Sequence, residues 1–118
     1  MSHSKKEFPR EACGILAGKN KEVKRVYKVT NIEKNPYLFF MDPKEQLKIM
    51  NQINTSGLKI LGIYHSHTDG SVYPSTRDIE LAFYPKVSYL IVSLKDNLQI
   101  KSFKIKEGRF KEERIRII

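Results

Sequence analysis

The sequence predicts an α+β fold, an α/β sandwich in which a mixed, largely antiparallel β-sheet is flanked by helices. Three observations support this prediction: short apolar or alternating segments between turn residues, two segments that begin with helix-start signals, and a hairpin turn near the C-terminus. The expected order of elements is β-β-β-α-β-α-β-β-β. At 118 residues the chain has the length of one domain, which is expected to span residues 1–118.

Three predicted strands precede the first helix. Ala12–Gly18 is a short apolar segment that ends at a glycine, as expected of a buried strand. Glu22–Thr30 is rich in β-branched valine, which favours a second strand. Tyr37–Met41, with the sequence YLFFM, is expected to form the third.

The first predicted helix begins after Asp42. Asp42 is a good N-cap, Pro43 suits the first turn, and Glu45 stands at the capping-box position. Gly57 suits the C-terminal end of this helix. Four residues between these signals follow at helical spacing: Leu47, Met50, Ile53 and Asn54.

The second half of the chain supplies the remaining elements. Leu58–Tyr64 is a continuous apolar segment, expected to be a strand buried on both faces. Residues 68–74 are expected to form a loop, and Ser75 to cap a short helix that runs to Phe83 before Pro85 ends it. Three strands follow, joined by turns at Asp96-Asn97 and Glu107-Gly108: Val87–Leu94, Leu98–Lys106 and Arg109–Ile118.

Composition and charge exclude several classes of protein. The composition, 40% hydrophobic and 30% charged, is that of a globular chain. No apolar run is long enough to cross a membrane, and the basic N-terminal segment lacks the apolar stretch of a secretory signal. A lone cysteine, Cys13, cannot form an internal disulfide, so a cytoplasmic location is expected.

The net charge is +9, from 22 basic and 13 acidic residues. Such a surface attracts anions, but the basic residues alternate with apolar positions as on solvated strands. No nucleic-acid motif and no glycine-rich phosphate loop accompany them, so a nucleic-acid partner is not favoured. Two interpretations stay open: a surface that favours an acidic partner, and an ordinary solvated surface.

The segment from His65 to Asp78 contains residues suited to metal chemistry. His65 and His67 stand two positions apart at the end of an apolar strand, where side chains at i and i+2 point to the same face. Asp78 follows a loop long enough to fold back. Two histidines and one carboxylate leave a fourth position for water, which is the arrangement of a catalytic zinc site.

Simpler interpretations of the same residues exist. The histidines could be surface residues, and Asp78 could only complete a capping box with Ser75. A metallo-β-lactamase pattern fails because Gly70 stands where its final histidine is needed, and no histidine follows His67. An amidohydrolase barrel fails because 118 residues cannot form eight βα units.

The segment HSHTDGSVYPSTRD resembles the motif of the JAMM (MPN+) metalloprotease family, H-[ST]-H-x7-S-x2-D, at every fixed position. Residues 9–18 also have the form P-x-E-x-C-G-[IL]-L-x-G found in its prokaryotic members. The resemblance spans nearly the whole chain and looks closest to stand-alone prokaryotic members of the Mec type, which release cysteine from a ubiquitin-like sulfur-carrier protein. It implies a cytidine-deaminase-like MPN fold.

The resemblance also implies a role for each motif residue. His65, His67 and Asp78 would be the ligands of one Zn²⁺ ion. Glu11 would be the general acid/base and Ser75 would hydrogen-bond the oxyanion. The implied reaction is hydrolysis of the amide bond after the C-terminal Gly-Gly of a ubiquitin-like or sulfur-carrier protein, by zinc-activated water. The assignment of Glu11 depends mostly on the match.

Two departures from the family pattern limit what it implies. The family usually begins with a full helix, but only eight residues precede Pro9, so this helix is expected to be short or truncated. The long insertions that select polyubiquitin linkages are absent, which disfavours a linkage-specific deubiquitinase. A zinc hydrolase of small amides or cysteine conjugates and a non-catalytic MPN scaffold are the alternatives, and the carrier protein, the pathway and the oligomeric state stay open.

Overall fold

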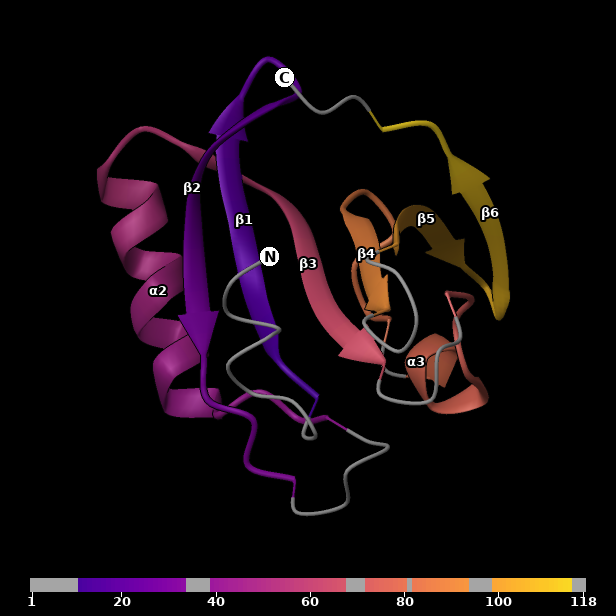
Figure 1. Cartoon of the computed structure of the whole chain (residues 1–118). Coiled ribbons are helices and arrows are strands. Elements are labelled where there is room, and N and C mark those ends of the chain that lie inside the picture. The colour runs from indigo at the N-terminus through magenta and orange to yellow at the C-terminus, as the bar shows by residue number, and fades with distance from the viewer. Residues whose placement is uncertain (1–10, 34–38, 68–71, 81, 94–98, 116–118) are drawn as a thin grey trace.

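The computed structural model describes residues 11–33, 39–67, 72–80, 82–93 and 99–115. Within these ranges the chain forms six strands and two helices (Figure 1). In chain order these elements are β1 (Cys13–Lys19), β2 (Glu22–Val29), α2 (Pro43–Thr55), β3 (Lys59–His67), α3 (Thr76–Glu80), β4 (Ser88–Ser93), β5 (Gln99–Lys106) and β6 (Arg109–Glu113).

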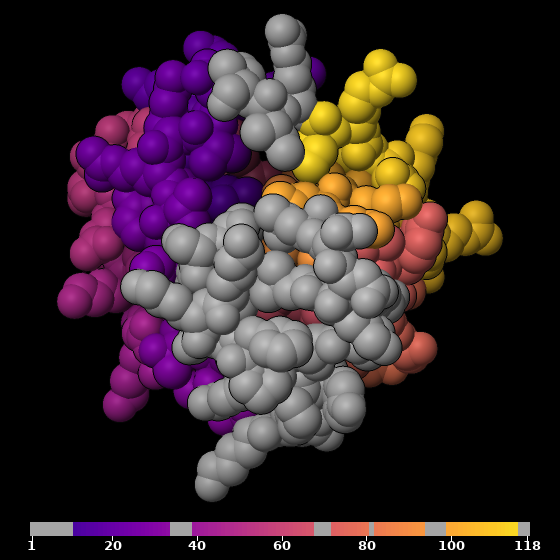
Figure 2. Space-filling model, viewed as in Figure 1, coloured from indigo at the N-terminus to yellow at the C-terminus, as the bar shows by residue number. Residues whose placement is uncertain are grey.

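The six strands form one mixed sheet in the order β2-β1-β3-β4-β5-β6. Every neighbouring pair is antiparallel except β3 and β4, which are parallel. A parallel pair needs a crossover connection, and α3 lies within it, facing the C-terminal end of β3 (Figure 1). The edge strands β2 and β6 lie toward opposite margins of the face seen in Figure 2. The predicted α+β class with a mixed, largely antiparallel sheet is confirmed.

One face of the sheet carries the main hydrophobic core. Cys13 pairs with His65 and Ile15 pairs with Ile63, so alternate residues of β1 and β3 point to the same side. The buried members of this core come from five strands, from α2 and from Met41. They are Cys13, Ile15, Ala17, Val29, Met41, Ile49, Ile53, Ile63, Tyr89, Ile91, Phe103 and Ile105. The histidines of β3 therefore extend the face that is buried by α2.

The predicted start of α2 is confirmed, with one difference. The Asp42 carboxylate accepts a hydrogen bond from the Lys44 amide at 2.9 Å, as an N-cap should. Glu45 accepts instead from the Thr30 amide at 3.2 Å, while the Asp42 amide donates to the Thr30 carbonyl. The capping box expected for Glu45 is thus replaced by two bonds to the end of β2. Leu47 is 63% exposed, and the buried residues of the helix are Ile49 and Ile53.

The strand predicted over Tyr37–Met41 is wrong for residues 39–41, the part that the structure describes. Tyr37 and Leu38 lie outside the described residues, and Met41 makes only an isolated bridge to Asn31. The Asn31 side-chain oxygen accepts from the Phe40 amide at 2.9 Å, which closes the segment as a loop. The segment pairs with residues 30–32 only at this bridge, where the Phe40 carbonyl accepts from the Ile32 amide at 3.0 Å, and no regular strand forms in its described part.

Other predicted boundaries shift by a few residues. The strand predicted over Leu58–Tyr64 continues through both histidines to His67. The short helix ends at Glu80 rather than at Phe83, and the Tyr84 amide beyond it donates to the Tyr89 hydroxyl. The last strand ends at Glu113, where its pairing with β5 ends.

The Glu107-Gly108 turn is confirmed, with φ of 53° and 74°, as two-residue hairpins of this type require. The Asp96-Asn97 turn and the expected short first helix lie outside the described residues. Within those residues, no helix is long and apolar enough to cross a membrane.

Candidate metal centre and catalytic site

His65 and His67 lie at the C-terminal end of β3, and their side chains point to the core face of the sheet. Their side chains are almost fully buried, with 2% and 7% exposed. The two Nε2 atoms are 3.0 Å apart and the ring centroids 4.8 Å apart. The strand alternation that places both rings on one side is the reason they converge.

Asp78 reaches the same point from α3. Its Oδ2 atom lies 2.9 Å from Nε2 of His67 and 3.2 Å from Nε2 of His65. The Ser75 amide also donates to this oxygen at 2.9 Å, and the Asp78 amide donates to the Ser75 hydroxyl at 3.1 Å. The capping box exists, and the same carboxylate faces both histidines. The two interpretations of Asp78 are therefore compatible, because the box fixes the carboxylate against the imidazoles.

The three atoms form a triangle that suits a small divalent cation. Its sides are 2.9, 3.0 and 3.2 Å. A tetrahedral zinc ion with bonds of about 2.0–2.1 Å separates its ligand atoms by about 3.3–3.4 Å, so the triangle is only slightly tighter than required. Two imidazole nitrogens and a carboxylate oxygen are also the donor types that zinc prefers. The residues fit a metal of this class.

Burial and hydrogen bonding act in opposite directions on these groups. Burial by itself would raise the pKa of Asp78, but hydrogen bonds from His65, His67 and the Ser75 amide outweigh it and hold the pKa well below its usual range. Burial lowers the pKa of His65 despite the favourable effect of Asp78. An ionised carboxylate beside a neutral imidazole is the protonation state that binds a metal.

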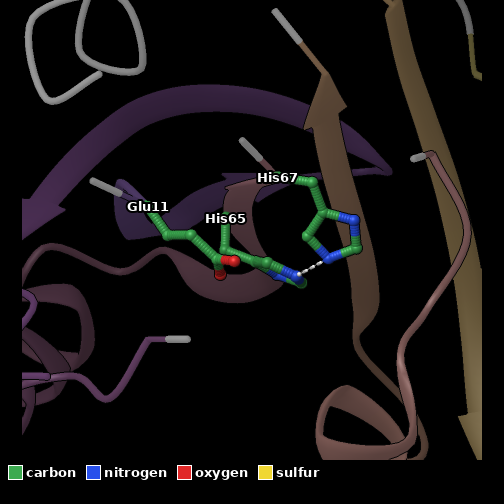
Figure 3. Close-up of side chains that lie close together, drawn as sticks. All are labelled: Glu11, His65 and His67. Atoms are coloured by element: carbon green, nitrogen blue, oxygen red, sulfur yellow. Dashed lines mark hydrogen bonds between the residues drawn. The ribbon is translucent and has the colours of Figure 1, made fainter. Parts of the chain in front are cut away.

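Glu11 lies beside both histidines, just before β1. The register that pairs Cys13 with His65 places residue 11 opposite His67 and on the same face of the sheet. Its side chain is buried. One of its carboxylate oxygens, one ring nitrogen of His65 and one ring nitrogen of His67 all lie within 4.8 Å of one another (Figure 3). Glu11 is thus a second carboxylate that could approach a metal, and the Asp78 carboxylate lies within 3.2 Å of both imidazoles.

The five residues that the sequence analysis singled out are thus brought together from three parts of the chain. Four of them are buried, namely Glu11, His65, His67 and Asp78, and Ser75 is exposed at the start of α3. This arrangement combines three converging potential ligand atoms, a buried carboxylate next to them and the hydroxyl of the exposed Ser75. Such a set of groups is suited to hydrolysis.

Three further residues contact this group or the peptide that follows Glu11, and none of them had a predicted role. Phe39 stacks on the His65 ring with centroids 4.3 Å apart. Asn31 donates to the Glu11 carbonyl at 2.8 Å, and the Ser66 hydroxyl accepts from the Ala12 amide at 2.7 Å. Ser66 could have been suspected, because it stands between the histidines and must point to the opposite face. For Asn31 and Phe39 the sequence offered no comparable signal.

Comparison with curated proteins finds relatives that are named as proteolytic enzymes. The CysO-cysteine peptidase of Mycobacterium tuberculosis is 34% identical over 100% of this chain and 84% of its own length. The probable TtuB-protein conjugate cleaving protease of Thermus thermophilus is 35% identical over 92% of this chain and 70% of its own length. The names of these relatives support a hydrolase that acts on peptide or isopeptide bonds.

Solved structures share the fold. A protein of Desulfitobacterium hafniense, known from a solution structure, has a TM-score of 0.83 and 39% identity, covering 95% of this chain and 81% of its own. A JAB1/MPN domain protein of Archaeoglobus fulgidus has a TM-score of 0.63 at 19% identity, covering 97% and 85%, and supports the fold alone. Residues 1–106 match the family described as prokaryotic homologs of the JAB domain. The resemblance stated from the motif is confirmed, and the chain belongs to this family.

Proposed function

We propose that this protein is a zinc-dependent peptidase that hydrolyses the amide bond after the C-terminal Gly-Gly of a ubiquitin-like or sulfur-carrier protein. His65, His67 and Asp78 hold one Zn²⁺ ion, Glu11 is the general acid/base, and Ser75 binds the oxyanion. The single observation that supports this most strongly is the convergence of the two Nε2 atoms and the Asp78 oxygen within 2.9–3.2 Å of one another, beside the buried Glu11.

The chain's own residues account for most of the chemistry. When bound, zinc polarises the scissile carbonyl and lowers the pKa of a coordinated water to about 7. The Glu11 carboxylate takes a proton from the attacking water and passes it to the nitrogen of the leaving amine. Its burial next to the histidines keeps it apart from bulk water, which suits a group that must transfer a proton between two reactants.

Ser75 is the exposed member of the set and is hydrogen-bonded to Asp78. Its hydroxyl oxygen accepts from the Asp78 amide, which leaves the hydroxyl proton for donation to a substrate oxygen. A donor directed at the developing oxyanion stabilises the transition state more than the ground state. Ser75 thus combines two roles: it caps α3, and so fixes Asp78, and it hydrogen-bonds the substrate.

The substrate class is supported by the names of two relatives. One is named a CysO-cysteine peptidase and the other a probable TtuB-protein conjugate cleaving protease, so both names describe cleavage of a conjugate. A Gly-Gly tail suits the buried position of the centre, because residues without side chains allow the closest approach of a backbone. The net charge of +9 favours an acidic carrier protein.

The test uses the zinc-loaded protein and three kinds of substrate. These are an acidic ubiquitin-like protein that ends in Gly-Gly-Cys, the same protein joined through its Gly-Gly terminus to a lysine side chain, and small amides without a carrier. Mass spectrometry should show release of the carrier with a free Gly-Gly terminus from one or both of the first two. The Glu11→Gln variant, loaded with the same metal, is the matched control and should leave them intact.

Two results would contradict the proposal. Hydrolysis of small amides without cleavage of either carrier adduct would favour a hydrolase of small conjugates. Failure of the zinc-loaded protein to hydrolyse any of the three would favour a non-catalytic scaffold that uses the same fold.

A further inference from the structure

The peptide group that joins Glu11 to Ala12 is held by side chains on both of its polar atoms. Its carbonyl oxygen accepts from Nδ2 of Asn31 at 2.8 Å, and its amide donates to the Ser66 hydroxyl at 2.7 Å. Both bonds are buried, and their side-chain partners are 20 and 54 residues away in sequence. A peptide plane fixed at both atoms leaves its residues little freedom to rotate.

The Ser66 bond takes the place of a regular sheet bond. The antiparallel register of β1 and β3 places Ala12 opposite Ser66, and the Ser66 amide donates to the Ala12 carbonyl at 2.9 Å as expected. The reciprocal bond from the Ala12 amide goes to the Ser66 hydroxyl instead of to a backbone carbonyl. At Ala12, the residue after Glu11, one of the two hydrogen bonds to β3 is therefore made by a side chain.

Asn31 connects the same peptide to the other side of the centre. Its side-chain oxygen accepts from the amides of Glu33 and Phe40 at 3.0 and 2.9 Å. Phe40 is next to Phe39, the ring that stacks on His65. One buried amide group thus ties the segment that carries Glu11 to the segment that packs on a histidine.

We infer that Asn31 and Ser66 are positioning residues for Glu11: they hold the Glu11–Ala12 peptide so that the carboxylate stays beside His65 and His67. This inference rests on the proposed function of Glu11 as the proton-transferring group. Neither side chain needs to touch substrate or metal for this role. Its effect is to keep the carboxylate at the distance and direction that proton transfer requires.

Two substitutions remove one bond each. Ser66→Ala deletes the acceptor of the Ala12 amide. Asn31→Asp removes the donor to the Glu11 carbonyl, yet it keeps an oxygen for the amides of Glu33 and Phe40. Because a displacement of about 1 Å can cost about 100-fold in rate, each variant should lower kcat by about 10- to 100-fold at full metal occupancy while KM changes little.

The matched control is Ser102→Ala. Ser102 is as buried as Ser66, and its hydroxyl also makes one hydrogen bond, to Glu113 at 2.6 Å, but it lies on β5, two strands from β3. This variant should keep the wild-type kcat. Ser66→Thr, which retains a hydroxyl, should restore most of the activity that Ser66→Ala loses.

A double-mutant cycle with Glu11→Gln separates positioning from a general structural effect. If Ser66 acts through Glu11, then Ser66→Ala should have little further effect on kcat in the Glu11→Gln background. Amide hydrogen exchange gives a readout that does not need activity: the Ala12 amide should be protected in the wild type and in Ser102→Ala, and should exchange faster in Ser66→Ala.

The outcomes distinguish this inference from the proposed function. If the wild type cleaves no conjugate, the proposed function fails, and the Ala12 exchange rates alone decide whether Ser66 holds the peptide. If the wild type is active, unchanged kcat in both variants would overturn the inference. The inference would also be overturned if the effects of Ser66→Ala and Glu11→Gln on kcat were fully additive. It would be overturned too if kcat fell only in proportion to metal lost from the variants.

Discussion

The imidazole ring of His65 stacks on the phenyl ring of Phe39, with centroids 4.3 Å apart and planes 18° from parallel. The Nδ1 atom of His65 has no hydrogen-bond partner among the described residues, although it is buried. Histidines that bind metals are usually oriented by a hydrogen bond from the second ring nitrogen. The stacked Phe39 ring therefore helps to fix the plane of His65, together with the contacts of its Nε2 atom to His67 and Asp78.

This stacking predicts that Phe39 influences metal affinity without touching the metal. Phe39→Ala should weaken zinc binding by about 10-fold or more, a typical effect of removing an orienting neighbour, whereas Phe39→Tyr should retain it. Competition with a chromophoric chelator gives the affinity. Phe40→Ala is the control, since that neighbouring side chain is 40% exposed. Equal affinities in Phe39→Ala and Phe40→Ala would contradict the prediction.

The metal ligands themselves can be tested by stoichiometry. The wild type should bind one zinc ion per chain, and His67→Ala and Asp78→Asn should bind close to none, because each removes one of the three converging ligand atoms. His3→Ala, which changes the remaining histidine of the sequence, should bind as the wild type does. Elemental analysis after purification without chelator gives the ratio. Equal loss in His3→Ala and His67→Ala would exclude this ligand assignment.

Glu11 should be separable from the ligands by its effect on rate. Glu11→Gln keeps the size of the side chain but cannot accept a proton, so zinc should remain bound while kcat falls by about 10²–10⁴-fold. Metal analysis and kcat are measured on the same preparation. A variant with full zinc and a rate within about threefold of wild type would show that another group transfers the proton.

The sheet beneath the centre depends on a close contact between Gly14 and Tyr64. These residues are directly opposite each other in β1 and β3, and a Cβ atom at residue 14 would overlap the Tyr64 ring, which is fully buried. Gly14→Ala should therefore lower the free energy of unfolding by about 1–3 kcal/mol, measured by urea denaturation. The cost should shrink in a Tyr64→Leu background, where the ring is gone. An equal cost in both backgrounds would mean that the overlap is not its cause.

The sequence predicted best those features that depend on neighbouring residues. The His65–His67 pair, the capping box of Ser75 and Asp78, and the Glu107-Gly108 turn each follow from short spacings, and the structure contains all three. Their geometry is fixed by local backbone rules. Long-range contacts do not need to be known for them.

Features that depend on long-range pairing were harder to predict. Composition and spacing do not place Glu11 opposite His67, because this follows from the register of two strands that are about fifty residues apart in sequence. The strand predicted over Tyr37–Met41 is wrong, in the part that the structure describes, for a related reason. The Phe40 amide donates to the side chain of Asn31, a contact that propensity does not encode.

The basic surface of the protein should help it to capture its substrate. With a net charge of +9 and exposed basic side chains such as Lys24, Arg25 and Lys28 on β2, the protein should attract an acidic carrier over some distance. Raising ionic strength from about 50 to about 500 mM shortens the screening length from roughly 14 to roughly 4 Å, so KM for the carrier conjugate should rise several-fold. The value of kcat should change less, because the reacting groups are buried and are screened weakly.

A small uncharged amide that the enzyme hydrolyses is the control, and its KM should not depend on salt. If KM for the conjugate is as insensitive to salt as KM for the amide, the basic surface has no part in capture. If kcat falls while KM is constant, salt acts on the centre itself.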